Sequence, residues 1–78
     1  MSGDALEVEA ATRRVTELVG SILRSLDEYR ENQITEDIIR RNVPIAKTVA
    51  IANGIDKGLV DRVNDDMVWM RVKRSFSV

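Results

Sequence analysis

The chain has 78 residues and a formal net charge of −1, from 12 lysine or arginine and 13 aspartate or glutamate residues. This length fits a single small domain, predicted over residues 1–78, with room for only a small hydrophobic core. Because cysteine and histidine are both absent, the composition excludes disulfides, thiolate or imidazole metal sites, and catalysis by a cysteine nucleophile or a histidine base.

Residues 4–31 are predicted to form one long amphipathic helix. The segment contains no proline, and its apolar residues recur every three or four positions, which is the spacing of one helical face. The apolar stripe is wider than one contact needs, so we expect one side to pack on the chain's own core and the other on a second copy. The predicted interface of this homodimer comprises Val15, Leu18, Val19, Ile22 and Leu26.

Two short helices are predicted next, over residues 36–42 and 44–53. Thr35 is a good N-cap for the first of them, because its hydroxyl can accept a hydrogen bond from a free backbone amide. Pro44 cannot continue that helix but suits the first turn of a new one. Gly54 follows as a residue that can adopt a positive φ and end the second helix.

The last part of the chain is predicted to form a β-hairpin over residues 59–73. Val68, Met70 and Val72 alternate with polar or large residues, which is the two-residue period of a half-buried strand. Residues 59–63 form the other strand and residues 64–66 the loop, and residues 75–78 offer a further strand edge. A competing interpretation continues one helix through residues 56–70. The single tryptophan, Trp69, is expected to pack beneath the first helix.

This order of elements resembles the winged helix-turn-helix family over residues 34–73. The resemblance rests on Ile34-Thr35-Glu36-Asp37-Ile38-Ile39-Arg40-Arg41-Asn42-Val43-Pro44-Ile45-Ala46-Lys47-Thr48-Val49 and on Lys57-Gly58-Leu59-Val60-Asp61-Arg62-Val63. It implies a mostly α fold with a C-terminal β-hairpin (α+β), with a helix-turn-helix over residues 34–58 and a wing over residues 59–73. The chain departs from the family in having Val43-Pro44 where the turn usually contains glycine. A shifted register would make residues 56–65 the reading helix.

The same resemblance implies a dimeric DNA-binding regulator of transcription or of a replicon. Residues 40–78 carry eight basic and four acidic residues, whereas residues 1–39 carry four and nine, so a cationic face is expected in the second half. Helix 44–53 would enter the major groove, and the hairpin would contact the DNA backbone. The candidate DNA-binding residues are Arg40, Arg41, Lys47, Thr48, Asn53, Lys57, Arg62, Arg71 and Lys73.

A protein-binding module is the alternative function, as an adaptor, an inhibitor or a subunit of a complex. Acidic residues at the predicted wing tip, Asp61, Asp65 and Asp66, favour it because they would repel phosphate. These three lack the spacing of a calcium loop. We therefore expect no catalytic residues, no metal ion, no cofactor and no enzymatic activity. The sequence has no long apolar run and no signal-peptide pattern, which predicts a cytoplasmic protein without a membrane partner.

Overall fold

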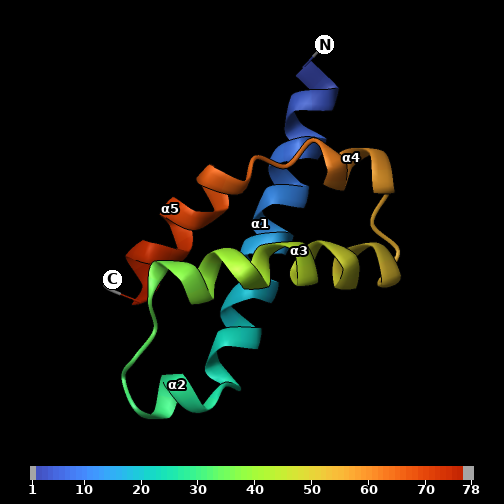
Figure 1. Ribbon diagram of the computed structural model, residues 1–78. Coiled ribbons are helices and arrows are strands. Elements are labelled where there is room, and N and C mark those ends of the chain that lie inside the picture. The colour runs from blue at the N-terminus through green and yellow to red at the C-terminus, as the bar shows by residue number, and fades with distance from the viewer. Residues whose placement is uncertain (1, 77–78) are drawn as a thin grey trace.

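The first helix organises the whole chain. In the computed structural model, which describes residues 2–76, α1 (Ser2–Arg24) lies against each of the other helices (Figure 1). The others are α2 (Asp27–Arg30), α3 (Glu36–Ala52), α4 (Lys57–Asp61) and α5 (Asp65–Phe76). Within residues 2–76 every regular element is a helix. The predicted first helix is correct in type, but it ends at Arg24, before the separate turn of α2.

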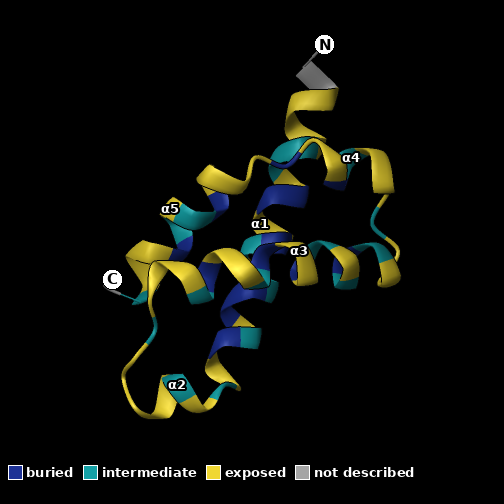
Figure 2. Cartoon of the chain, viewed as in Figure 1, coloured by how far each residue is buried: buried dark blue, intermediate teal, exposed yellow. Residues whose placement is uncertain are grey.

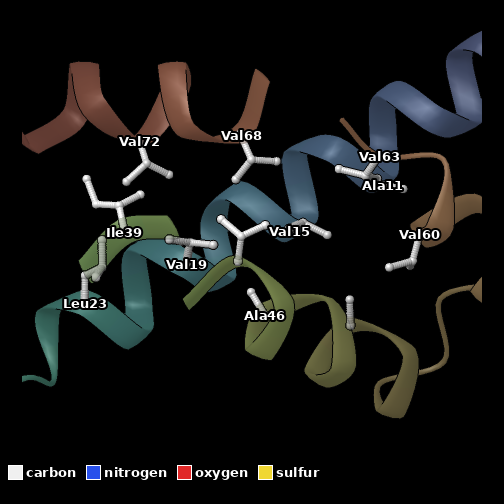
Figure 3. Packing of buried hydrophobic residues seen from close by; sticks show 12 residues of the cluster. Ala11, Val15, Val19, Leu23, Ile39, Ala46, Val60, Val63, Val68 and Val72 are labelled. Atoms are coloured by element: carbon white, nitrogen blue, oxygen red, sulfur yellow. The ribbon is translucent and has the colours of Figure 1, made fainter. Parts of the chain in front are cut away.

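The core lies between α1, α3 and α5. On α1, Ala11, Val15, Val19 and Leu23 are spaced four residues apart and are at most 4% exposed, so they form one buried ridge (Figures 2 and 3). The residues that cover this ridge come from the later helices and the turn after α4: Ile39, Val43, Ala46, Ala50, Val60, Val63, Val68 and Val72. Burial of these side chains is the main force that holds the helices together.

The α3 helix begins as predicted but does not break where predicted. The Thr35 side chain accepts a hydrogen bond from the Ile38 amide (3.4 Å), which confirms the cap. Pro44, however, lies inside one continuous helix, so the prediction of two helices separated at Pro44 is wrong. The buried residues Ile39, Val43, Ala46 and Ala50 keep one helical spacing across the proline. Burial of this continuous stripe outweighs the single amide hydrogen bond that proline removes.

The predicted β-hairpin, and with it the α+β fold class, is wrong. Residues 59–73 form α4, a short turn and most of α5. Met70 decides between the two patterns: a strand that buries Val68 and Val72 would bury Met70 as well, yet Met70 is 54% exposed. Val68 and Val72 instead share a face because they are four residues apart on a helix. The competing single helix over residues 56–70 is closer in type but is interrupted after Asp61.

Side-chain caps explain why two helices replace the hairpin. The Asp56 carboxylate accepts a hydrogen bond from the Leu59 amide (3.2 Å) and starts α4. The Asn64 side-chain oxygen accepts one from the Met67 amide (3.0 Å) and starts α5. The residues read as a polar hairpin loop thus serve to begin a helix. Of the strand edge predicted at residues 75–78, Ser75 and Phe76 belong to α5, and residues 77–78 lie outside the described part of the chain.

The molecule is elongated because α1 extends past its neighbours. The Cα radius of gyration is 12.5 Å, against about 11.5 Å for a compact chain of this length. The accessible surface of 5149 Å² exceeds the roughly 4,800 Å² of a typical monomer of this mass. Residues 4–7 are all exposed, and since they span more than one helical turn, no side of α1 is covered there (Figure 2).

Candidate interaction surface

The predicted dimer interface divides into two groups in the structure. Val15 and Val19 have no exposed surface and belong to the chain's own core, so a second copy cannot reach them in this fold. The reason is that α3 and α5 both pack on the ridge that these residues form. Leu18, Ile22 and Leu26 are half-buried at the edge of the core, and their contact with a second copy stays a prediction.

Three of the predicted DNA-binding residues meet along one side of α3 and α5, which we call the α3–α5 seam. Arg40 on α3 and Lys73 on α5 both lie over the ring of Trp69, at 5.4 and 5.7 Å from its centre. Lys47, one turn beyond the proline, forms an ion pair with Asp65 and donates a hydrogen bond to the Val63 carbonyl (3.0 Å). The Lys47 side chain is only 22% exposed.

The cations of this seam already have partners within the chain. The Arg40 guanidinium donates hydrogen bonds to Glu36 (2.8 Å) and Asp66 (3.0 Å). These two bonds, that to Glu36 first, raise the pKa of Arg40 above its ordinary value. A phosphate would have to compete with three carboxylates, those of Glu36, Asp65 and Asp66, for Arg40 and Lys47. The seam is therefore close to neutral in charge.

The other predicted DNA-binding residues are dispersed over the molecule. Lys57 pairs with Asp61 on α4 (2.8 Å), which raises the pKa of the lysine. The Thr48 hydroxyl donates to the Pro44 carbonyl (3.1 Å). The remaining members lie at helix ends or on outer surfaces: Asn53 and Arg62 are the C-caps of α3 and α4, and Arg41 is exposed on α3.

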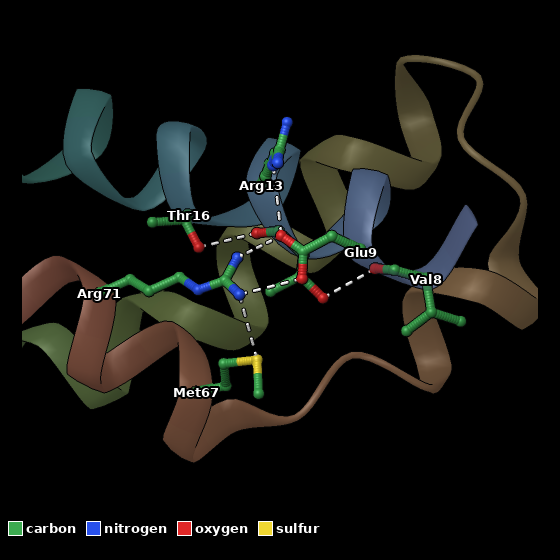
Figure 4. Close-up of polar contacts among 7 residues, drawn as sticks. Val8, Glu9, Arg13, Thr16, Met67 and Arg71 are labelled. Atoms are coloured by element: carbon green, nitrogen blue, oxygen red, sulfur yellow. Dashed lines mark hydrogen bonds and ion pairs between the residues drawn. The ribbon is translucent and has the colours of Figure 1, made fainter. Parts of the chain in front are cut away.

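Arg71 points away from the seam and joins α5 to α1. Its guanidinium donates two hydrogen bonds to the Glu9 carboxylate, at 2.8 and 2.9 Å (Figure 4). Arg13, one turn along α1, also donates to Glu9 (3.2 Å). The hydrogen bonds from Arg71 lower the pKa of Glu9, and the same contact raises the pKa of Arg71. Arg71 is thus a structural link in this fold.

An open groove lies between α1 and the start of α4, outside the predicted dimer and DNA-binding sites. Its volume is about 660 Å³. Apolar side chains dominate its lining, and charged groups stand among them. The α1–α4 groove is lined by Glu7, Ala10, Ala11, Arg14, Ile55, Asp56 and Leu59. Ala10 is exposed, and Ile55 and Leu59 are only partly buried, so an incoming apolar side chain can reach all three.

The groove continues onto the outer face of α1. A shallow depression there shares Ala10 and Arg14 with the groove and also includes Leu6, Arg13 and Glu17. Leu6 is 71% exposed, the largest exposed fraction among the large apolar residues of the described chain. A sequence signal for this surface existed in Ala10-Ala11 beside Leu6, but only the position of α4 turns these residues into a groove.

A second exposed apolar surface lies on the outer side of α5. Met67 and Met70 are 45% and 54% exposed and border a hollow of about 360 Å³ together with Arg71 and Arg74. Methionine side chains of this kind adapt to partners of varied shape. This surface is smaller than the α1–α4 groove and is made by one helix and its N-terminal turn.

The described residues contain neither a metal cluster nor a membrane-spanning element. No group of three or more acidic side chains in residues 2–76 is arranged to hold a metal ion. None of the helices in that range combines the length and apolar character needed to cross a bilayer. Comparisons with protein-family models, with curated proteins and with solved structures find no match to this chain.

Proposed function

We propose that this chain is a non-catalytic protein-binding domain and that the α1–α4 groove receives the partner. One observation carries the proposal: an open, mainly apolar groove adjoins a full turn of α1 that the chain itself leaves uncovered. Exposed apolar surface of this kind is costly in water unless a partner covers it. The charged residues Glu7, Arg14 and Asp56 at the groove would orient the partner.

Site-specific photo-crosslinking in cells that produce the chain tests this proposal. A photoreactive amino acid of similar size replaces Leu6, which is exposed beside the groove, and a matched variant carries it at Arg41, which is exposed on α3. We expect a protein adduct at position 6 that survives nuclease treatment and is missing at position 41. Adding Arg14→Glu should reduce the yield. Equal adducts at both positions, or an adduct to nucleic acid at position 6, would refute the proposal.

DNA binding is the second candidate, and the α3–α5 seam is the observation that favours it. Three predicted residues, Arg40, Lys47 and Lys73, do lie near one another there, beside a partly exposed tryptophan. The carboxylates of the seam weaken this candidate relative to protein binding.

A titration with random-sequence duplex DNA tests the second candidate. Affinity should fall by orders of magnitude between about 50 and 200 mM salt if phosphate contacts dominate. At a fixed salt concentration, Lys73→Glu should weaken DNA binding relative to the wild type, whereas the control Arg30→Glu on α2 should not. An absence of binding at the lower salt concentration would eliminate this function.

A further inference from the structure

The charged residues on the α1 side of the α1–α4 groove, Glu7 and Arg14, are self-complementary. Glu7 and Arg14 stand seven residues apart on α1, and Ala10 and Ala11 lie midway between them. Consider a second α1 that runs antiparallel to the first and is related to it by a two-fold axis midway between Ala10 and Ala11. Arg14 of the second copy then lies at the same height along the helix as Glu7 of the first. Each acidic group then lies opposite a basic group, and this happens twice because the arrangement is symmetric.

We infer that the occupant of the groove is a second copy of this chain, with its α1 antiparallel to the first; the inference rests on the proposed function above. A small residue at the centre permits it. Ala10 is exposed and has no side-chain atoms beyond Cβ, so the two helix axes can approach to about 8 Å, the lower limit for packed helices. The same approach covers Ile55 and Leu59 at the edge of each groove.

The uncovered turn of α1 fits the same register. With the axis between Ala10 and Ala11, Leu6 reaches the level of Val15 in the second copy, where Arg14 and Glu17 border the shallow depression on the outer face. The aliphatic parts of those two side chains can cover Leu6 while their charged ends remain in water. The residues that extend past the first bundle thus gain contacts from the second.

One pair of helices and the rim of the groove form a small contact, so we expect the dimer to dissociate on dilution. A small specific interface buries roughly 600 Å² from each partner, which is about 12% of the 5149 Å² surface of this chain. The charges at the groove also distinguish this occupant from a wholly acidic or wholly basic helix. Either of those would place a like charge against Glu7 or against Arg14.

Sedimentation equilibrium of the purified full chain, from about 1 µM to 1 mM, tests the inference. The apparent mass should rise from one copy toward two. Ala10→Arg fills the centre of the contact and should weaken association at least about tenfold. The control Ala5→Arg places the same side chain on another face of the same exposed part of α1 and should leave association unchanged. Far-ultraviolet dichroism checks that each variant is folded.

Charge exchange tests the antiparallel register. Glu7→Arg and Arg14→Glu should each weaken self-association at least about tenfold, because each opposes like charges twice. An equimolar mixture of the two variants should associate again, since every pair then joins opposite charges. Glu31→Arg and Arg41→Glu, matched changes on exposed sites away from the groove, should have no effect alone or mixed.

Two results would overturn the inference. One is a wild-type chain that remains a single copy throughout the concentration range. The other is a dimer that neither Ala10→Arg nor the separate charge changes weaken. If the chain is a single copy and the photoreactive group at position 6 captures a different protein, the second copy is refuted while the protein-binding function stands. If position 6 captures nothing, both fall.

Discussion

Two hydrogen bonds between Arg71 and Glu9 connect the last helix of the chain to the first (Figure 4). Both side chains are about one-third exposed, so water weakens the attraction between the two charges but does not abolish it. The pair lies beside the core residues that α1 and α5 bury together. Its contribution to stability depends on the charge of Glu9 and therefore on pH.

We expect acid to weaken the fold through this pair. Because the bonds from Arg71 lower the pKa of Glu9, the ionised carboxylate stabilises the folded state above the ordinary glutamate pKa of about 4.3. That contribution is lost as the pH falls through this value toward the lowered pKa of the folded state. Glu9→Gln should reduce the chain's stability at pH 7 and flatten its loss between pH 6 and about pH 3. Urea unfolding at several pH values measures both effects; an unchanged slope would contradict the assignment.

At the scale of single residues, helix caps and helix-ending residues could be predicted from the sequence, whereas the partners of the charged side chains could not. Thr35 as a cap and Gly54 as a positive-φ residue (φ 98°) are both confirmed, because each follows from backbone geometry within a few residues. Lys47 on α3 pairs with Asp65 on α5, and Arg71 on α5 pairs with Glu9 on α1, 62 residues earlier in the chain. A list of charged residues therefore indicates a cationic face but cannot show which cations remain unpaired.

At the scale of elements, Pro44 is the position where the predicted and observed helices differ most directly. The proline is exposed in the interior of α3, so its cost lies in the backbone and not in side-chain packing. The amide that it lacks would otherwise donate to the Arg40 carbonyl, four residues earlier. The helix continues through Pro44 because its buried apolar residues lie on one face both before and after the proline.

Pro44→Ala should therefore stabilise the chain, by roughly 1–3 kcal/mol, since alanine restores an interior hydrogen bond and suits a helix better. Part of the gain is offset because alanine leaves the unfolded chain more freedom. Urea unfolding of the variant beside the wild type measures the difference. If Pro44 instead began a separate helix, where its missing amide costs nothing, the substitution would bring no gain.

The hairpin is predicted because a short amphipathic segment can fit both the two-residue period of a strand and the 3.6-residue period of a helix. Val68, Met70 and Val72 satisfy a strand pattern, while Val68 and Val72 alone satisfy a helical one. The cap at Asn64 and the exposure of Met70 separate the two, and neither is visible in the alternation itself. The long helix and the capped helix after Thr35 were more predictable because their apolar spacing persists over more turns.

At the scale of the whole molecule, the groove depends on how α4 meets α1. Ile55 and Leu59 are about 45 residues from Ala10 and Arg14 in the sequence, and only the path of the chain through α3 brings them together. Two of the residues predicted for self-association on α1, Val15 and Val19, are instead buried in the chain's own core. The face left open is the adjoining one, which carries Leu6 and Ala10.

The connection between α1 and α3 has a different consequence. No residue of α2 is buried, whereas α1 supplies one side of a core whose other side comes from α3, α4 and α5 (Figure 3). A chain severed within residues 27–33 should consequently behave as a complementing pair. Each fragment alone should be largely unstructured, because neither encloses an apolar interior, and mixing them should restore helical dichroism. The gain in helical dichroism on mixing would then report that the two separately produced fragments have bound to each other.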